Sequence, residues 1–217
     1  MIRVHQSIVN ESKAKLPIEN IIEVGQDLFG SMVIFIERIH KSLPLDLPLE
    51  KSTILAYLYF YYGEGLYKNK KLYKKYQLYL QANGLIIKPK LFIPVETGFG
   101  SVFSRYFRNI YQIYKYIDSA KYLDYDTRYY YSKIVRSVLS TVEQNILFYN
   151  ILSPMGKAWI SEKLVFKYKP IKNMSLEENR LYSPVSWLRS LNIEDLDQDY
   201  IYNFFEYYDN ENNGSLE

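Results

Sequence analysis

Hydrophobic residues recur every three or four positions along most of this sequence, and this spacing restricts the fold to helices. The clearest case runs from Val102 to Asp118. Apolar residues that share one face of a helix there are Phe103, Tyr106, Phe107, Ile110, Ile113, Tyr114 and Ile117. A half-buried strand would instead alternate at every second residue. Because no segment shows that alternation, we predict an all-α fold, an irregular helical bundle of about six to eight helices.

Other segments carry similar helical patterns. A long pattern covers residues 17–43 and is followed by two prolines. The stretch Thr53–Tyr62 is almost continuously apolar and aromatic, which predicts a buried helix. We predict further helices over residues 66–82, 127–149 and 194–208.

Prolines and glycines divide the rest of the chain. They interrupt residues 85–101, which we interpret as a loop with room for a small hairpin near residues 85–95. Beyond residue 155 the helical patterns become shorter and end in an acidic, polar tail. We therefore predict a helical core domain over residues 1–155 and a C-terminal helical appendage over 156–217.

The composition excludes several kinds of site. The chain has no cysteine and only two histidines, His5 and His40, which leaves little material for a metal site or a Ser-His-Asp triad. The longest apolar run, Ile54–Tyr62, is far shorter than the roughly 20 residues of a membrane-spanning helix. The N-terminus lacks an apolar signal core. We expect a cytoplasmic protein without a membrane span, a metal or a cofactor.

The charged residues are distributed unevenly. Seven lysines and no acidic residue lie between Leu66 and Lys90, whereas eight acidic residues and no Lys or Arg follow Arg189. Lysines with tyrosines between them can hold a nucleic-acid backbone while the rings stack on bases. The candidate residues for such a patch are Lys68, Lys71, Lys74 and Lys75. An ordinary solvated helix face explains the same pattern.

Two consecutive segments carry a resemblance to a known family. The first is SRYFRNIYQIYKYID (104–118), and the second is YYSKIVRSVLSTVEQNILFYNILS (130–153). Together they resemble the signature of the phage abortive infection proteins (AbiC-like), and the aromatic segment at 56–65 is similar to the family's upstream helix. The matching residues are Tyr106, Phe107, Arg108, Lys115, Ile117, Asp118, Arg136, Leu139, Ser140, Glu143, Leu147, Phe148, Tyr149 and Asn150.

The resemblance implies a bacterial role in excluding phage, with arrest of the host's growth, but it brings no known reaction. The chain departs from the family in two ways. Family members often carry membrane-spanning segments near the N-terminus, which this sequence lacks. A histidine often precedes the Tyr-Phe-Arg triplet, where this chain has Arg105.

The strongest candidate binding site lies on the two central helices. On a continuous helix Arg136, Ser140 and Glu143 would share one face, where they could hold a phosphate or a partner peptide. The same three residues could instead form a buried network that fixes the register of two helices. Arg108, Tyr111 and Lys115 on the preceding helix complete the candidate set, although a solvated basic face explains them as well.

Three functions remain open at this point. The first is recognition of a phage or host protein by an abortive infection protein. The second is an RNA-targeting toxin enzyme, although the usual motif, a His four to six residues after an Arg, is missing and the alternating Asp195, Asp197 and Asp199 read as acidic surface. The third is a structural subunit of a larger defence complex. Nucleic acid and a second copy of the chain remain open as partners.

Overall fold

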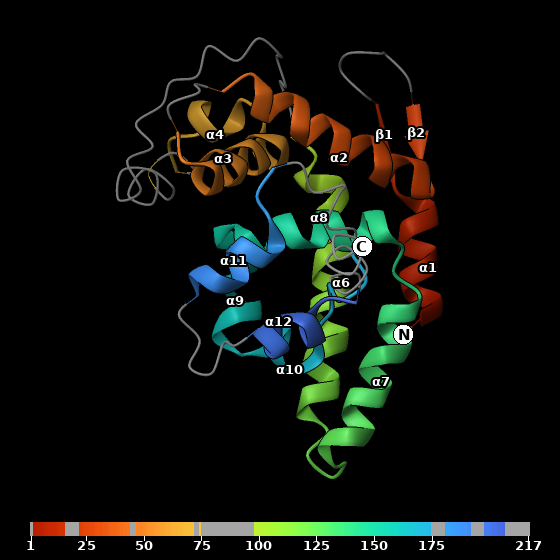
Figure 1. Ribbon diagram of the computed structural model, residues 1–217. Helices are drawn as coiled ribbons and strands as arrows, with labels where there is room; N and C mark the ends of the chain where they lie inside the picture. Colours follow the sequence, from red (N-terminus) through yellow and green to blue (C-terminus); the bar gives the residue numbers. More distant parts are fainter. Residues whose placement is uncertain are drawn as a thin grey trace, which may run out of the picture. The chain divides into compact units, whose positions relative to one another are not determined.

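The structure, a computed structural model, describes residues 2–15, 22–43, 47–71, 74, 98–174, 181–191 and 198–206. Its internal contacts divide the chain into two compact units. We call residues 6–106 the N-terminal unit, and residues 1–5 together with 107–217 the C-terminal unit. Helices dominate both units, as Figure 1 shows, so the predicted all-α fold is confirmed. The domain boundary predicted near residue 155 stays a prediction.

The N-terminal unit holds a short antiparallel hairpin and several helices. Strand β1 pairs with β2 so that Lys13 faces Val24. Its elements are β1 (Lys13–Lys15), β2 (Ile22–Val24), α2 (Gly25–Lys41), α3 (Leu49–Tyr62) and α4 (Gly65–Lys68), together with α1 (Ile2–Glu11) from Gln6 onwards.

The helix predicted over residues 17–43 is wrong at its beginning. Residues Ile22–Val24 form a strand, and α2 starts only at Gly25. Gly25 has a φ of 60°, a left-handed conformation that ends any helix entering from the N-terminal side. The apolar spacing continues through this glycine in the sequence, so the pattern alone overestimated the length of the helix.

The core of the N-terminal unit is aromatic. Helix α3 is buried along most of its length, which confirms the buried helix predicted over Thr53–Tyr62. Phe60 stacks on Phe99 with ring centroids 5.3 Å apart, and Phe29 meets Phe103 edge-on at 5.1 Å. Such offset and edge-on pairs add stability beyond the area that the rings bury.

The Lys- and Tyr-rich helix predicted over residues 66–82 is not continuous. Helix α4 ends at Lys68, and Asn69 adopts an extended conformation. The possible hairpin near residues 85–95 lies outside the described residues.

The C-terminal unit begins within a long helix and continues through several shorter ones. Its elements are α6 (Gly100–Ser119), α7 (Tyr125–Ser137), α8 (Thr141–Leu152), the 3₁₀ turn η1 (Pro154–Gly156), α9 (Lys157–Ser161), α10 (Leu164–Tyr168), α11 (Pro184–Ser190) and α12 (Gln198–Phe204). Helix α7 returns beside the C-terminal half of α6 (Figure 1). All seven residues of the apolar face predicted for α6 are buried, which confirms that prediction.

The single helix predicted over residues 127–149 is instead two helices. Helix α7 ends at Ser137, and α8 starts at Thr141 with Ser140 as its N-cap. The Ser140 side chain accepts a hydrogen bond from the backbone of Glu143, and the Glu143 side chain accepts one from the backbone N–H of Ser140. This capping box satisfies two helix-end donors and fixes the start of α8.

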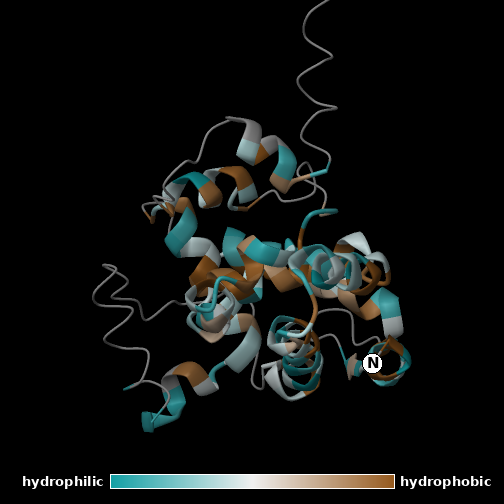
Figure 2. Ribbon diagram, turned by 90° about the horizontal axis from the view of Figure 1, so that it is seen from below, coloured by the Kyte–Doolittle hydropathy of each residue, from teal (hydrophilic) through white to brown (hydrophobic). Residues whose placement is uncertain are grey.

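Figure 2 shows how hydropathy is distributed along these helices, with hydrophobic (brown) and hydrophilic (teal) stretches on the same ribbons. Helix α8 differs from an amphipathic helix because it is buried almost completely. Its polar residues Glu143, Gln144, Asn145 and Asn150 are buried too. Buried polar groups must find internal partners, so they determine how the neighbouring elements pack.

Candidate functional site

Glu143 lies at the centre of a buried polar cluster. Its side chain is completely buried, and Oε1 lies 3.0 Å from Nε2 of His5, which is itself only 2% exposed. The other carboxylate oxygen accepts hydrogen bonds from the backbone N–H and the hydroxyl of Ser140, both at 3.0 Å. Glu143 therefore links the start of α8 to the N-terminal residues of α1.

Arg136 is also buried, with 7% of its surface exposed. Its Nη1 donates hydrogen bonds to the carbonyl oxygens of Tyr168 at 3.2 Å and Lys169 at 3.1 Å. These carbonyls lie at the C-terminal end of α10, where the last backbone acceptors have no partner within the helix. The described contacts of Arg136 and Glu143 thus lead to different parts of the unit.

The candidate residues of α6 lie nearer to solvent. Arg108 is exposed, and none of the described hydrogen bonds or ion pairs involves its side chain. Tyr111 donates a hydrogen bond of 2.7 Å to Glu162 Oε1, and Lys115 pairs with the other oxygen of the same carboxylate. The hydrogen bond from Lys115 lowers the pKa of Glu162, and burial followed by the bond to Glu162 raises the pKa of Tyr111.

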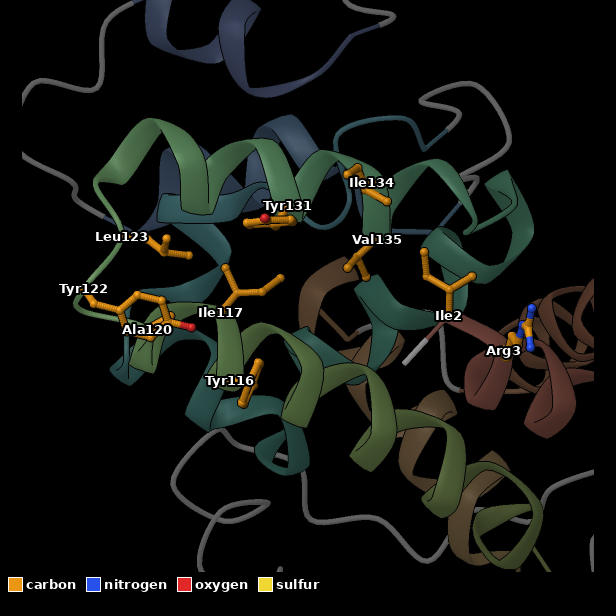
Figure 3. Close-up of a pocket in the computed structure, with 10 residues that line it drawn as sticks. All are labelled: Ile2, Arg3, Tyr116, Ile117, Ala120, Tyr122, Leu123, Tyr131, Ile134 and Val135. Atoms are coloured by element: carbon orange, nitrogen blue, oxygen red, sulfur yellow. The ribbon is translucent and has the colours of Figure 1, made fainter.

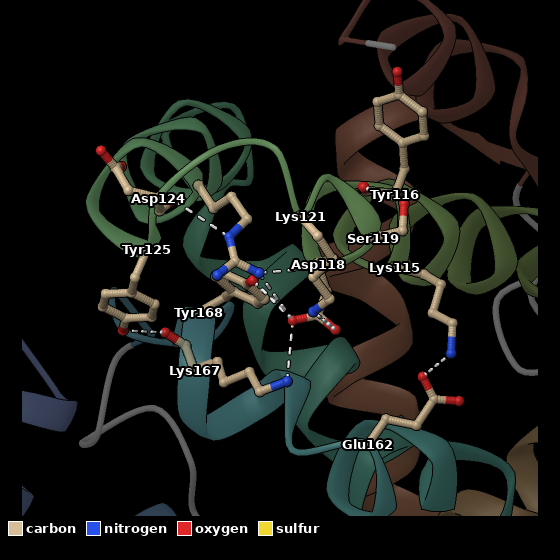
Figure 4. A network of polar contacts seen from close by, with 11 residues as sticks. Lys115, Tyr116, Asp118, Ser119, Lys121, Asp124, Tyr125, Glu162, Lys167 and Tyr168 are labelled. Atoms are coloured by element: carbon tan, nitrogen blue, oxygen red, sulfur yellow. Dashed lines mark hydrogen bonds and ion pairs between the residues drawn. The ribbon is translucent and has the colours of Figure 1, made fainter.

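Asp118 collects more polar contacts than the sequence suggested. Figure 4 shows its carboxylate among side chains of α7 and α10. Lys167 Nζ lies 3.0 Å from Oδ1, and the Tyr168 hydroxyl donates to the same oxygen at 2.9 Å. Lys121 lies 3.5 Å from Oδ2, and Arg128 donates to the backbone carbonyl of Asp118 at 3.3 Å.

These contacts shift the pKa values of Asp118 and Tyr168. Partial burial acts to raise the pKa of Asp118, but the hydrogen bonds from Lys167 and Tyr168 outweigh it and the pKa is lowered. Burial, assisted by the bond to Asp118, raises the pKa of Tyr168 to about 12. The Asp118 cluster therefore requires a charged carboxylate and a neutral phenol, the forms that predominate near neutral pH.

An open, mostly apolar groove of about 600 Å³ lies between α6 and α7. Figure 3 shows Ile117, Tyr131 and Val135 around the groove and Arg3 at one end. The groove is lined by Ile2, Arg3, Tyr116, Ile117, Ala120, Tyr122, Leu123, Tyr131, Ile134 and Val135. The helical pattern did not reveal the groove because it does not show which tyrosines remain exposed. Tyr116, Tyr122 and Tyr131 are 59%, 82% and 46% exposed.

The predicted lysine patch is only partly covered by the structure. Lys68, Lys71 and Lys74 are exposed, Lys68 pairs with Glu64, and Lys75 lies outside the described residues. Within the described ranges no three His, Asp or Glu side chains are grouped as metal ligands. In the same part of the chain no helix has the length and apolar character needed to cross a bilayer.

Comparison with known proteins supports the resemblance. Residues 99–179 match the family model described as "Putative phage abortive infection protein". The resemblance predicted from the sequence is thereby confirmed over this segment, which contains α6 to α10. No curated protein and no solved structure gave a match.

Proposed function

We propose that this chain acts in defence against phage and that it does so by binding a phage or host protein. The observation that carries the proposal is the family match over residues 99–179. That segment supplies every described residue that lines the groove except Ile2 and Arg3. Binding is favoured because this segment presents exposed tyrosines around an apolar groove.

The groove has the character of a protein-binding surface. Tyrosine is enriched where proteins bind one another, because it combines a large apolar ring with a hydrogen-bonding hydroxyl. The groove has a volume of about 600 Å³, which is large enough for several apolar side chains. Among the described lining residues only Arg3 is charged. The partner we propose is therefore an apolar protein segment with an acidic side chain placed against Arg3.

The candidate polar residues divide between two roles in this proposal. Arg108 and Lys115 are exposed on α6, where a partner can reach them, and Lys115 would then exchange or share its pairing with Glu162. Arg136, Ser140 and Glu143 act indirectly, because their internal contacts hold the ends of α8 and α10 in place. Replacing the exposed residues should weaken binding, whereas replacing the buried ones should first weaken the fold.

The test is a plaque assay in a phage-sensitive bacterial host that expresses the chain. Ile134→Glu places a charge in the groove, and we expect it to abolish the reduction in plaques that the unchanged chain gives. Ser137→Glu is the matched control, because it adds the same charge to an exposed position of α7 that does not line the groove. Circular dichroism of both purified variants checks that they fold.

Each result has a separate meaning. If the unchanged chain protects against no phage of a broad panel, the defence role is wrong. If the chain protects and both folded variants protect equally well, the groove is not the binding surface. Discrete cleavage of RNA by the purified chain would favour the toxin enzyme over recognition.

A further inference from the structure

Three basic residues make hydrogen bonds near the C-terminal end of α10. Arg136 Nη1 is held there by the carbonyl oxygens of Tyr168 and Lys169, at 3.2 and 3.1 Å. The ammonium groups of Lys169 and Lys172 both donate to the carbonyl oxygen of Asn203, at 3.0 and 3.3 Å. Two ammonium groups that share one acceptor are close neighbours.

None of these three cations contacts a carboxylate of the described residues. Their described acceptors are backbone carbonyls, and Lys169 also lies over the rings of Tyr200 and Phe204 at 5.9 and 6.0 Å. The neighbouring Asp118 cluster differs, because its cations share a carboxylate. The positive charge of Arg136, Lys169 and Lys172 is thus less neutralised than that of the cations around Asp118.

Such an arrangement is unfavourable without a counter-ion. Burial, and then the like charges of Lys172 and Arg136, lower the pKa of Lys169. Carbonyl dipoles at the ends of short helices offset only part of that repulsion. Arg136 also keeps its Nε and Nη2 donors without a partner among the described residues, although the side chain is almost fully buried.

We propose that Arg136, Lys169 and Lys172 form a binding site for a phosphate group. The planar guanidinium can donate two parallel hydrogen bonds to phosphate oxygens, and the two lysines add point charges on a more exposed side. A phosphate carries several negative charges and acceptors, which matches three cations better than a single carboxylate does. The site does not include the groove and does not depend on the proposed defence role.

The experiment measures binding by the full chain with three probes: inorganic phosphate, adenosine monophosphate and a single-stranded oligouridylate. Isothermal titration calorimetry gives the affinities, with ionic strength matched by sodium chloride. We expect binding of at least one probe, and a loss of about tenfold or more in Lys172→Gln, because a charge-assisted hydrogen bond is removed. Lys157→Gln is the control, since Lys157 is an exposed lysine of α9 outside this group.

The three probes distinguish the sources of the phosphate. Tighter binding of the oligonucleotide than of the mononucleotide indicates a nucleic-acid backbone, whereas equal binding of phosphate and mononucleotide indicates a free phosphate group. If Lys172→Gln fails to fold, Lys169→Gln takes its place in the same comparison. Absence of binding by all probes, or equal losses in Lys172→Gln and Lys157→Gln, would overturn the proposal.

Discussion

The same chemical change at two neighbouring tyrosines should destabilise the fold at one position and not at the other. Tyr114 and Tyr168 are both fully buried, and their ring centroids lie 6.3 Å apart. The Tyr168 hydroxyl donates to Asp118 at 2.9 Å, whereas the Tyr114 hydroxyl has no hydrogen-bond partner among the described residues. Substitution by phenylalanine removes only the hydroxyl and leaves the ring contacts in place.

The expected magnitudes follow from these contacts. A hydrogen bond to a charged group contributes about 1.5–3 kcal/mol, and Asp118 keeps its bond to Lys167, so Tyr168→Phe should cost about 1.5 kcal/mol. A buried hydroxyl without a partner is unfavourable, so Tyr114→Phe should be neutral or stabilise the fold by up to about 1 kcal/mol.

Urea unfolding followed by tryptophan fluorescence measures both effects. Trp159 and Trp187 are each only 2% exposed and belong to the same unit as the two tyrosines, so their emission reports on that unit. A loss of about 1.5 kcal/mol or more in Tyr114→Phe would refute the reasoning, because the hydroxyl would then have a partner such as an enclosed water. No loss in Tyr168→Phe would refute the role given to the bond with Asp118.

Three other substitutions test the remaining contacts by urea unfolding. Glu143→Ala should cost about 3–5 kcal/mol, because it removes a buried carboxylate and leaves His5 without it, and a cost below about 1 kcal/mol would contradict the importance of the pair. The pKa of Asp118 is lowered in the folded state, so its contribution to folding stability is present above the unfolded-state pKa near 3.8 and disappears as the pH falls through the folded-state pKa. Asp118→Asn should therefore lower the free energy of unfolding strongly at pH 6, and this loss should shrink towards pH 3. Gly156→Ala should cost about 1–3 kcal/mol because the added Cβ would overlap the Asn150 carbonyl, and an unchanged midpoint would show that η1 can shift.

The spacing of apolar residues predicted correctly those helices that are buried on one face and exposed on the other. Helix α6 carries an apolar stripe with a helical period, and that stripe is buried as expected. The break between α7 and α8 was missed because Val138 and Leu139 continue the apolar spacing. The signal that could have revealed it was present in the sequence, since Ser140 followed by Glu143 has the spacing of a capping box.

Contacts between residues far apart in the chain could not be predicted from the sequence patterns. Lys167 and Tyr168 lie 49 and 50 residues from Asp118, and nothing in their local spacing marks them as its partners. The pairing of Glu143 with His5 joins positions even farther apart in the chain. Such contacts depend on how the helices pack, whereas a periodic pattern reports only which face of one helix is buried.

Several residues that carry the family resemblance therefore hold the fold together, and they do not by themselves identify a binding partner. Asp118, Arg136, Ser140 and Glu143 belong to the matched pattern, and the described contacts of each connect or cap helices of the C-terminal unit. Buried polar contacts of this kind specify a fold because each one leaves an unsatisfied group if the packing changes. A target has to be bound by surface that remains open, and the described surface offers the tyrosine-lined groove and the cations around Lys172. The pattern contributes only Ile117 to the groove and Arg136 to the cation group. A match to the pattern therefore predicts mainly the scaffold, and the binding experiments must identify the partner.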